Sequence, residues 1–203
     1  MAPAHTRPVL SCQDVEKIYG SRDNVTRALD GVSFDVAAGE YVAVMGPSGS
    51  GKTTMLNCVS TIDRPTSGHI YVDGQDITAL RAGQLSKFRR ERLGFVFQDS
   101  NLLDILTARE NIALALTINH VPAKEVVARV TGVAQRLGVT EVLDKFPHEM
   151  SGGQKQRVAA ARAIVTDPSL VLADEPTGAL DSRNSRLLLE SLEDLNNAGA
   201  TII

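Results

Sequence analysis

The sequence lacks any run of about 18 apolar residues, the length that a membrane-spanning helix needs. It also lacks an apolar stretch near its start: residues 1–8 are polar and contain proline, so we expect no signal peptide. Its 2 cysteines, Cys12 and Cys58, have neither the spacing of a zinc site nor the density of a disulfide framework. They suit buried thiols in a reducing compartment. These absences favour a cytoplasmic protein that works at a membrane only through a partner.

Strong charge of one sign is absent as well. The formal net charge is −3, and the densest basic cluster, residues 87–92, is interrupted by Glu91. Nucleic-acid binding needs clustered Lys and Arg to neutralise phosphates, so we expect no obligatory nucleic-acid partner. We interpret the 87–92 cluster as the solvated face of a helix. A chain of 203 residues, 43% of them hydrophobic, is long enough for one domain with its own core.

Strand-like and helix-like segments alternate along the chain. A helix is predicted to start near Lys52 and to stop before Pro65, and an amphipathic helix is predicted over 185–196. Helical period also dominates 103–165, most clearly at 108–114 and 126–137. Short β-like runs occur at 9–19, 31–36, 41–45, 69–72, 93–97, 170–173 and 201–203. This alternation predicts an α/β fold with a largely parallel sheet and a helical insertion.

The most informative motif starts at Gly46. Residues 46–53 match the phosphate-binding pattern G-x-x-x-x-G-K-[ST], directly after the apolar run 41–45. The glycines let the backbone curl around phosphate oxygens, Lys52 is placed to meet the β- and γ-phosphates, and the Thr53 hydroxyl is placed to bind Mg²⁺. A glycine-rich turn without a ligand is the alternative. We predict a site for a nucleoside triphosphate formed by Gly46, Ser48, Gly49, Ser50, Gly51, Lys52, Thr53 and Thr54.

Two adjacent carboxylates, Asp174 and Glu175, follow the apolar run 170–173. Ligands of open α/β sheets bind at the carboxyl ends of the strands. In phosphoryl transfer one acid holds the metal, commonly through water, and a second can polarise the attacking water. We therefore assign Asp174 to Mg²⁺ and Glu175 to the general base, and we expect an extended backbone to point the two side chains in different directions. An exposed acidic turn is the alternative.

A second anion-binding feature lies at residues 151–154. Ser151 is a plausible N-cap, and Gly152 and Gly153 expose backbone N–H groups at the start of a helix. One nucleotide does not need two such loops, unless each loop serves a different nucleotide across a symmetric dimer.

With these motifs the sequence resembles the ATP-binding-cassette (ABC) ATPases, the nucleotide-binding subunits of ABC transporters, over essentially its whole length. The resemblance implies a P-loop NTPase fold: a RecA-like, mostly parallel core sheet with an antiparallel N-terminal β subdomain and an inserted α-helical subdomain. It implies a nucleotide-binding core of residues 1–98 and 166–203 and a helical signature subdomain of residues 99–165. It also implies that the signature loop, with Met150 where leucine is usual, completes the ATP site of a partner subunit through Ser151, Gly152, Gly153 and Gln154.

The resemblance further implies roles for single residues. Gln98 is expected to contact Mg²⁺ and the attacking water, which places it with Glu175 and Lys52 in the catalytic set, and to sense the transmembrane partner. Tyr19 is expected to stack on adenine, and 179–181 to cross the dimer interface. The 4 histidines match no catalytic position. Because the sequence stops inside the strand that precedes the family's switch histidine, we expect a truncated domain that binds ATP but hydrolyses it weakly.

Local similarities narrow the group. Residues 60–68 are similar to exporter-type ATPases for lipoproteins, macrolides and antimicrobial peptides, and 97–104, 109–112 and 175–182 to bacitracin- and lantibiotic-type resistance transporters. These similarities imply a homodimer that forms on ATP binding and powers a transmembrane permease from the inner face of the membrane. The main alternative is a non-transport ABC ATPase that regulates a membrane partner, as in cell division. A soluble ABC ATPase of translation or DNA repair, and a P-loop kinase or GTPase, fit the sequence less well.

Overall fold

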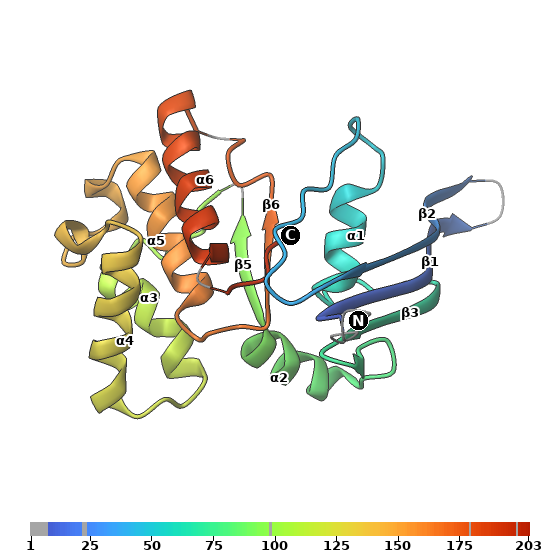
Figure 1. The fold of residues 1–203 in the computed structure, drawn as a ribbon, viewed down its shortest axis with the longest axis horizontal. Coiled ribbons are helices and arrows are strands. Elements are labelled where there is room, and N and C mark those ends of the chain that lie inside the picture. Colours follow the sequence, from blue (N-terminus) through green and yellow to red (C-terminus); the bar gives the residue numbers. More distant parts are fainter. Residues whose placement is uncertain (1–7, 22–23, 98, 179, 198) are drawn as a thin grey trace, which may run out of the picture.

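A computed structural model describes residues 8–21, 24–97, 99–178, 180–197 and 199–203. In Figure 1, the helices α3 to α6 lie on one side of the strands β5 and β6, and α1 lies on the other side with the strands β1 to β3. The helices and strands are β1 (Leu10–Ser21), β2 (Asn24–Val36), α1 (Lys52–Val59), β3 (Ser67–Val72), β4 (Gln75–Asp76), α2 (Ala82–Arg92), β5 (Leu93–Phe97), α3 (Ala108–Ile118), α4 (Ala123–Arg136), α5 (Gly152–Ile164), β6 (Leu170–Asp174) and α6 (Ser182–Asn197).

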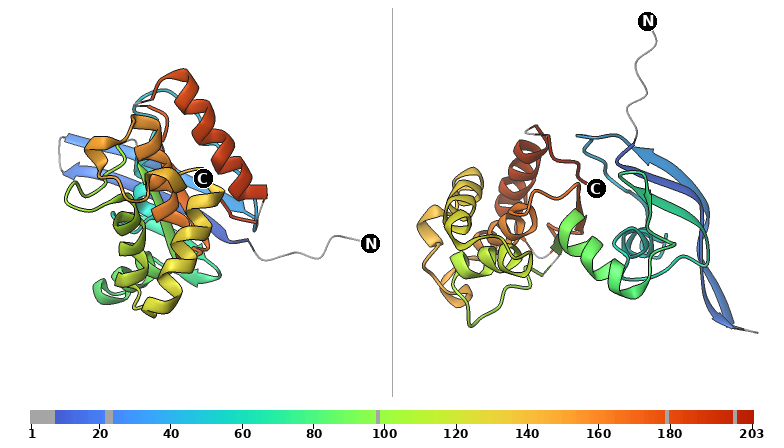
Figure 2. Two further views of the ribbon diagram at one scale, coloured as in Figure 1. Left: turned by 90° about the vertical axis from the view of Figure 1, so that its left-hand side faces the viewer. Right: turned by 90° about the horizontal axis from the view of Figure 1, so that it is seen from below.

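An antiparallel sheet with the strand order β2-β1-β3-β4 forms the N-terminal part. The strands predicted at 9–19, 31–36 and 69–72 are confirmed, although β2 begins earlier than predicted, at Asn24. Figure 2 shows this sheet curving around α1. The phosphate-loop helix is therefore held against the sheet through its buried residues Met55, Cys58 and Val59.

The parallel sheet is smaller than predicted. β5 and β6 pair in parallel from Leu93 with Leu170 to Phe97 with Asp174, which brings the ends of both strands to one edge. The predicted strands 41–45 and 201–203 form only single bridges, of Ile202 with Tyr41 and with Val171. The prediction of a strand over 41–45 is therefore wrong beyond its first residues. The last ladder bond runs from Val42 N to Ile202 O (2.9 Å), and Met45 is 89% exposed.

β6 lies between two hydrophobic clusters. Leu170 and Leu172 pack with the antiparallel sheet, α1 and α2, whereas Val171 packs with α3, α4, α5 and α6. This alternation follows from the two-residue period of a strand that is covered on both faces. The end of β6, which carries the predicted acidic pair, is therefore fixed from both sides.

The predicted helices are confirmed with shifted ends. α3 begins at Ala108 because Thr107 and Glu110 form a capping box: Glu110 N donates to Thr107 Oγ1 (3.3 Å) and Thr107 N donates to Glu110 Oε2 (2.8 Å). α6 begins three residues before the predicted start at 185. None of the described helices is long and apolar enough to cross a membrane.

Candidate active site

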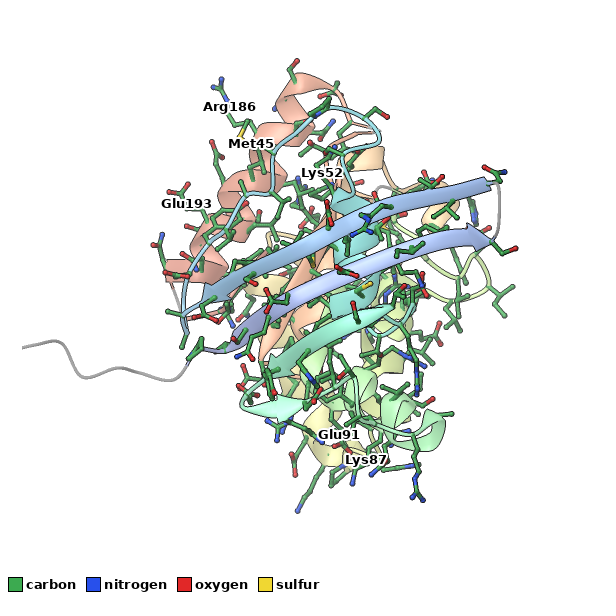
Figure 3. The ribbon with its side chains drawn as sticks, turned by 90° about the vertical axis from the view of Figure 1, so that its right-hand side faces the viewer. Met45, Lys52, Lys87, Glu91, Arg186 and Glu193 are labelled. Carbon is green, nitrogen blue, oxygen red and sulfur yellow. The ribbon has the colours of Figure 1, made fainter. Side chains whose placement is uncertain are left out.

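The phosphate loop leads directly into α1. Gly51 caps the helix in the left-handed conformation (φ 92°), and a Cβ built there would lie 2.4 Å from Ala28 O, so only glycine fits this position. Lys52 Nζ donates to Gly46 O (2.9 Å) and to Pro47 O (3.0 Å). Figure 3 shows Lys52 at the start of α1, above the edge of β2, with the rest of α1 behind the strands β1 to β3. The ammonium group and the free N–H groups of the first helical turn therefore lie beside one exposed loop.

Thr53 and Asp174, which are 121 positions apart, meet at the end of β6. Thr53 Oγ1 donates to Asp174 Oδ1 at 3.4 Å, and both residues line a cavity of about 370 Å³ together with Phe97, Asp99, Asn101 and Glu175. The described residues contain no group of three or more His, Cys, Asp or Glu side chains that could hold a metal. A hydroxyl and one carboxylate are hard oxygen ligands, and they fit Mg²⁺, which is usually held by one or two carboxylates together with phosphate and water oxygens.

Glu175 lies just beyond β6 in a strained backbone conformation. Its φ is 45°, in the left-handed region that residues with a Cβ seldom adopt. Our expectation of an extended backbone at this point is therefore wrong. A turn from Glu175 to Gly178, closed by a bond from Gly178 N to Glu175 O (2.9 Å), sets the direction of the side chain instead. The exposed carboxylate remains on the cavity that Thr53 and Asp174 also line.

The signature loop forms a helix start, as predicted. Ser151 Oγ accepts from Gln154 N (3.2 Å), and Ser151 N donates to Gln154 Oε1 (2.9 Å), which makes a reciprocal capping box at the start of α5. A Cβ on Gly153 would lie 2.0 Å from Asn184 Oδ1, so a larger residue here would force the Asn184 side chain of α6 to move. The loop is therefore shaped by contacts within its own chain.

Asp181 caps the start of α6 beside the signature loop. Asn184 N and Asn184 Nδ2 donate to its two carboxylate oxygens at 2.8 Å, and these hydrogen bonds lower the pKa of Asp181. Ala179, the first residue of the predicted interface loop, lies outside the described residues, as does Gln98.

The structure does not bring the signature loop into the cavity of Thr53 and Asp174. Gly152 lines a different cavity, of about 290 Å³, with Leu180, Lys155 and residues 99–102. Asp99 and Asn101 line both cavities. Within the described residues, the two predicted anion-binding loops therefore serve two separate, neighbouring cavities.

Tyr19 lies near the end of β1 and is 40% exposed. Its hydroxyl donates to Asp63 Oδ2 (2.8 Å), and Lys17 Nζ lies 4.8 Å from the centre of its ring and donates to Asp63 Oδ1 (2.6 Å). Burial opposes the charge of Asp63, but the hydrogen bonds from Lys17, Tyr19 and Arg64 N outweigh it and lower the pKa of this carboxyl. These contacts fix the position of the Tyr19 ring.

A largely apolar groove of about 460 Å³ lies between α2, β5, α3 and α5, and the motifs do not predict it. Its lining includes three basic residues, Arg89, Arg90 and Arg162, and none of the described lining residues is acidic. Arg90 Nε is buried and has no hydrogen-bond partner in the described part of the chain. Arg89 donates to Thr61 O and Oγ1, both at 3.0 Å. The interpretation of 87–92 as a solvated face is therefore wrong for Arg89 and Arg90. Figure 3 shows it to hold for Lys87 and Glu91.

Two further residues escape sequence reasoning because their partners are distant backbone carbonyls. Gln156 Nε2 donates to Phe97 O (2.5 Å) and Pro176 O (3.1 Å), and its side chain is buried. Arg162 donates to Ser100 O (3.0 Å) and Asn101 O (2.7 Å), and burial lowers its pKa. The only sequence signal is that both polar residues lie on α5 among buried alanines and Val158.

The fold and the site define a P-loop protein that binds nucleoside triphosphates. Residues 29–178 match the ABC transporter family, and the chain belongs to this family as an ATP-binding subunit with ATPase activity. It is 47% identical over 196 residues to the bacitracin export ATP-binding protein BceA of Halalkalibacterium halodurans, covering 96% of this chain and 78% of that protein. It is 45% identical to the macrolide export ATP-binding/permease protein MacB of Hyphomonas neptunium, covering 98% of this chain and 31% of that protein.

Solved structures agree with this assignment. The dimeric structure of MJ0796, a bacterial ABC transporter cassette, has a TM-score of 0.84 and 38% identity, and covers 95% of this chain and 85% of that one. The same cassette has a dimeric post-hydrolysis structure bound to ADP and Pi, with the same TM-score, identity and coverage. These likenesses confirm the predicted P-loop NTPase fold.

Proposed function

We propose that this chain powers a separate membrane permease that exports, or confers resistance to, antimicrobial peptides or lipid-like molecules. The observation that carries the proposal is the 47% identity to BceA, a bacitracin export protein, along 96% of the chain. The 45% identity to MacB also supports export, but that protein is a macrolide exporter, so its substrate class differs. In this proposal the chain acts at the inner face of the membrane, through its permease.

The proposed ATP site starts from the phosphate loop. Lys52 and the N–H groups of residues 49–54 bind the phosphates, and Tyr19, fixed by Asp63, offers its exposed ring to the adenine. Thr53 and Asp174 would hold Mg²⁺ with Gln98, and the 3.4 Å contact of Thr53 with Asp174 supports this pair. Bound Mg²⁺ would neutralise phosphate charge. Glu175, on the same cavity, is the proposed general base.

A second copy of the chain completes each site in this proposal. The start of α5 is formed by Ser151, Gly152, Gly153 and Gln154. Gly152 lines a different cavity from that of Thr53, which supports a role of this loop toward the nucleotide of a partner subunit. The dimeric MJ0796 structures support the same arrangement by likeness.

The permease is proposed to dock on the arginine-lined groove. This groove is lined by α2 and β5 on one side and by α3 and α5 on the other. We propose that it lies at the boundary between the nucleotide-binding core (1–98 and 166–203) and the helical subdomain (99–165). Its apolar lining and three arginines suit an amphipathic permease segment with a carboxylate. Arg162 joins the groove to residues 100–101, which line the cavity of Gly152, and Asn101 also lines the cavity of Thr53 and Asp174.

A reconstitution experiment tests the transport proposal. The protein is copurified with its permease in lipid vesicles, and ATPase turnover is measured with a bacitracin-type peptide, with a macrolide and without addition. Stimulation by the peptide alone is expected. If neither the peptide nor the macrolide stimulates ATPase turnover, and the complex activates an extracytoplasmic cell-wall hydrolase, the non-transport alternative is favoured instead.

Substitution of Glu175 tests the catalytic assignment. We expect Glu175→Gln to lower kcat by about 100-fold or more, because it removes the general base, and to leave ATP binding intact. The variant should also form a stable dimer with ATP. Near-normal turnover of Glu175→Gln would refute the base assignment without touching the choice of substrate.

A further inference from the structure

Gln156 connects three parts of the molecule with one side chain. It lies on α5, two residues after the signature loop, and is 2% exposed. Its amide nitrogen donates to Phe97 O at the end of β5 and to Pro176 O just beyond β6. One carboxamide nitrogen carries two N–H donors, so the two bonds use its whole donor capacity.

The two carbonyls adjoin residues proposed for the reaction. Phe97 directly precedes Gln98, and Pro176 directly follows Glu175. Pro176 has no N–H group of its own, so its backbone cannot be held by donation from that residue. Its carbonyl is held by Gln156 instead.

The backbone of Glu175 needs such support. A non-glycine residue at φ 45° is strained, and such conformations persist only where the surroundings hold them. The turn bond from Gly178 N fixes the carbonyl of Glu175 itself, and the bond from Gln156 fixes the carbonyl of the next residue, Pro176.

We propose that Gln156 is a positioning residue that holds the strained turn at Glu175 and ties it to the end of β5, so that the Glu175 carboxylate is aimed into the cavity of Thr53 and Asp174. Gln156 does not line that cavity, so it acts through Glu175. The inference rests on the proposed role of Glu175 as the general base.

The test is a double-mutant cycle on ATPase turnover in the purified protein. Gln156→Leu removes both donors at similar volume, and we expect kcat to fall roughly tenfold while KM for ATP stays within about twofold, since the phosphate loop is untouched. In the Glu175→Gln background the same substitution should cause no further loss, because the group that Gln156 aims is already gone. Gln135→Leu, on the exposed side of α4, is the matched control and should change neither constant.

Other results overturn the proposal. An unchanged kcat for Gln156→Leu, or an equal loss in both backgrounds, shows that Gln156 does not act through Glu175. If the Glu175→Gln single variant keeps normal turnover, Glu175 is not the general base. This result is independent of the Gln156 variants, so it is distinguishable from a failure of the Gln156 proposal.

A second variant keeps the test decisive if Gln156→Leu does not fold. Gln156→Glu keeps the shape but points a carboxyl at two carbonyl oxygens, which raises its pKa. Protonated, the acid can donate to one carbonyl; ionised, it can donate to none. Turnover relative to the natural protein should therefore rise as the pH falls. A pH-independent ratio would count against positioning through these bonds.

Discussion

Single residues with backbone partners organise this site more than side-chain pairs do. Lys52 bonds to two carbonyls of its own loop, Gln156 to one carbonyl at the end of β5 and one just beyond β6, and Arg162 to two carbonyls of the 100–101 loop. Motif spacing predicted Lys52, Thr53, Asp174 and Glu175, because each belongs to a short, fixed pattern. Gln156 could not be predicted in this way, because its partner is a backbone carbonyl 59 positions away, and every residue type has such a carbonyl.

Lys52 is the clearest test at this scale. We expect Lys52→Ala to weaken ATP binding about tenfold or more, because a charge-assisted contact to phosphate contributes roughly 1.5–3 kcal/mol. Binding is measured with a fluorescent ATP analogue. Lys87→Ala, an exposed lysine at the far end of the molecule in Figure 3, is the matched control. Equal affinities for both variants would remove Lys52 from the site.

At the scale of elements, α5 and α6 contact each other close to their starts. Gly153 leaves room for Asn184, and Asn184 in turn bonds to Asp181, the cap of α6. The sequence predicted both helices but not this contact, because their relative position depends on tertiary packing. The prediction of a strand over 41–45 is wrong for a related reason. Its apolar run predicts a buried strand, but a strand needs a neighbouring strand to pair with, and only its first residues pair with the segment at Ile202.

Gly153→Ala tests the contact between these helices. A methyl group there would displace Asn184, so we expect the free energy of unfolding to fall by about 1–3 kcal/mol, measured by denaturant titration. Adding Asn184→Ala should recover part of the loss, because it vacates the space. If the double variant is no more stable than Gly153→Ala, the steric account is wrong.

Asp181 gives α6 a pH-dependent start. Its pKa is lowered in the folded protein, so its contribution to stability is complete above the unfolded value of about 3.9 and is lost as the pH falls through the lower folded value. We expect Asp181→Ala to melt at a lower temperature than the natural protein at pH 7. The gap should close in acid below about pH 4. A gap that persists there would mean that Asp181 stabilises α6 by means other than its charge.

At the scale of the whole molecule, the two predicted loops line different cavities, which supports our proposal that each ATP site is composed of two chains. The sequence pointed to this arrangement through the presence of two anion-binding loops. It could not place them, because the distance between them depends on how α5 packs against β5 and α6.

Mixing two defective chains tests the shared site. Lys52→Ala damages one loop and Ser151→Phe the other, so neither variant alone should hydrolyse ATP. A mixed dimer contains one site with both loops intact, and the mixture should therefore regain turnover. Turnover that stays at the level of the separate variants would show that each chain builds its site alone.

β6 has one more consequence, for how this molecule comes apart. Leu170 and Leu172 belong to one hydrophobic cluster and Val171 to the other, so neither cluster can melt while the strand keeps its place in the other. Thermal unfolding should therefore follow a single cooperative transition, and the amides of β6 should be among the slowest to exchange with solvent. The strand that leads into the acidic pair therefore also couples the folding of the two hydrophobic clusters.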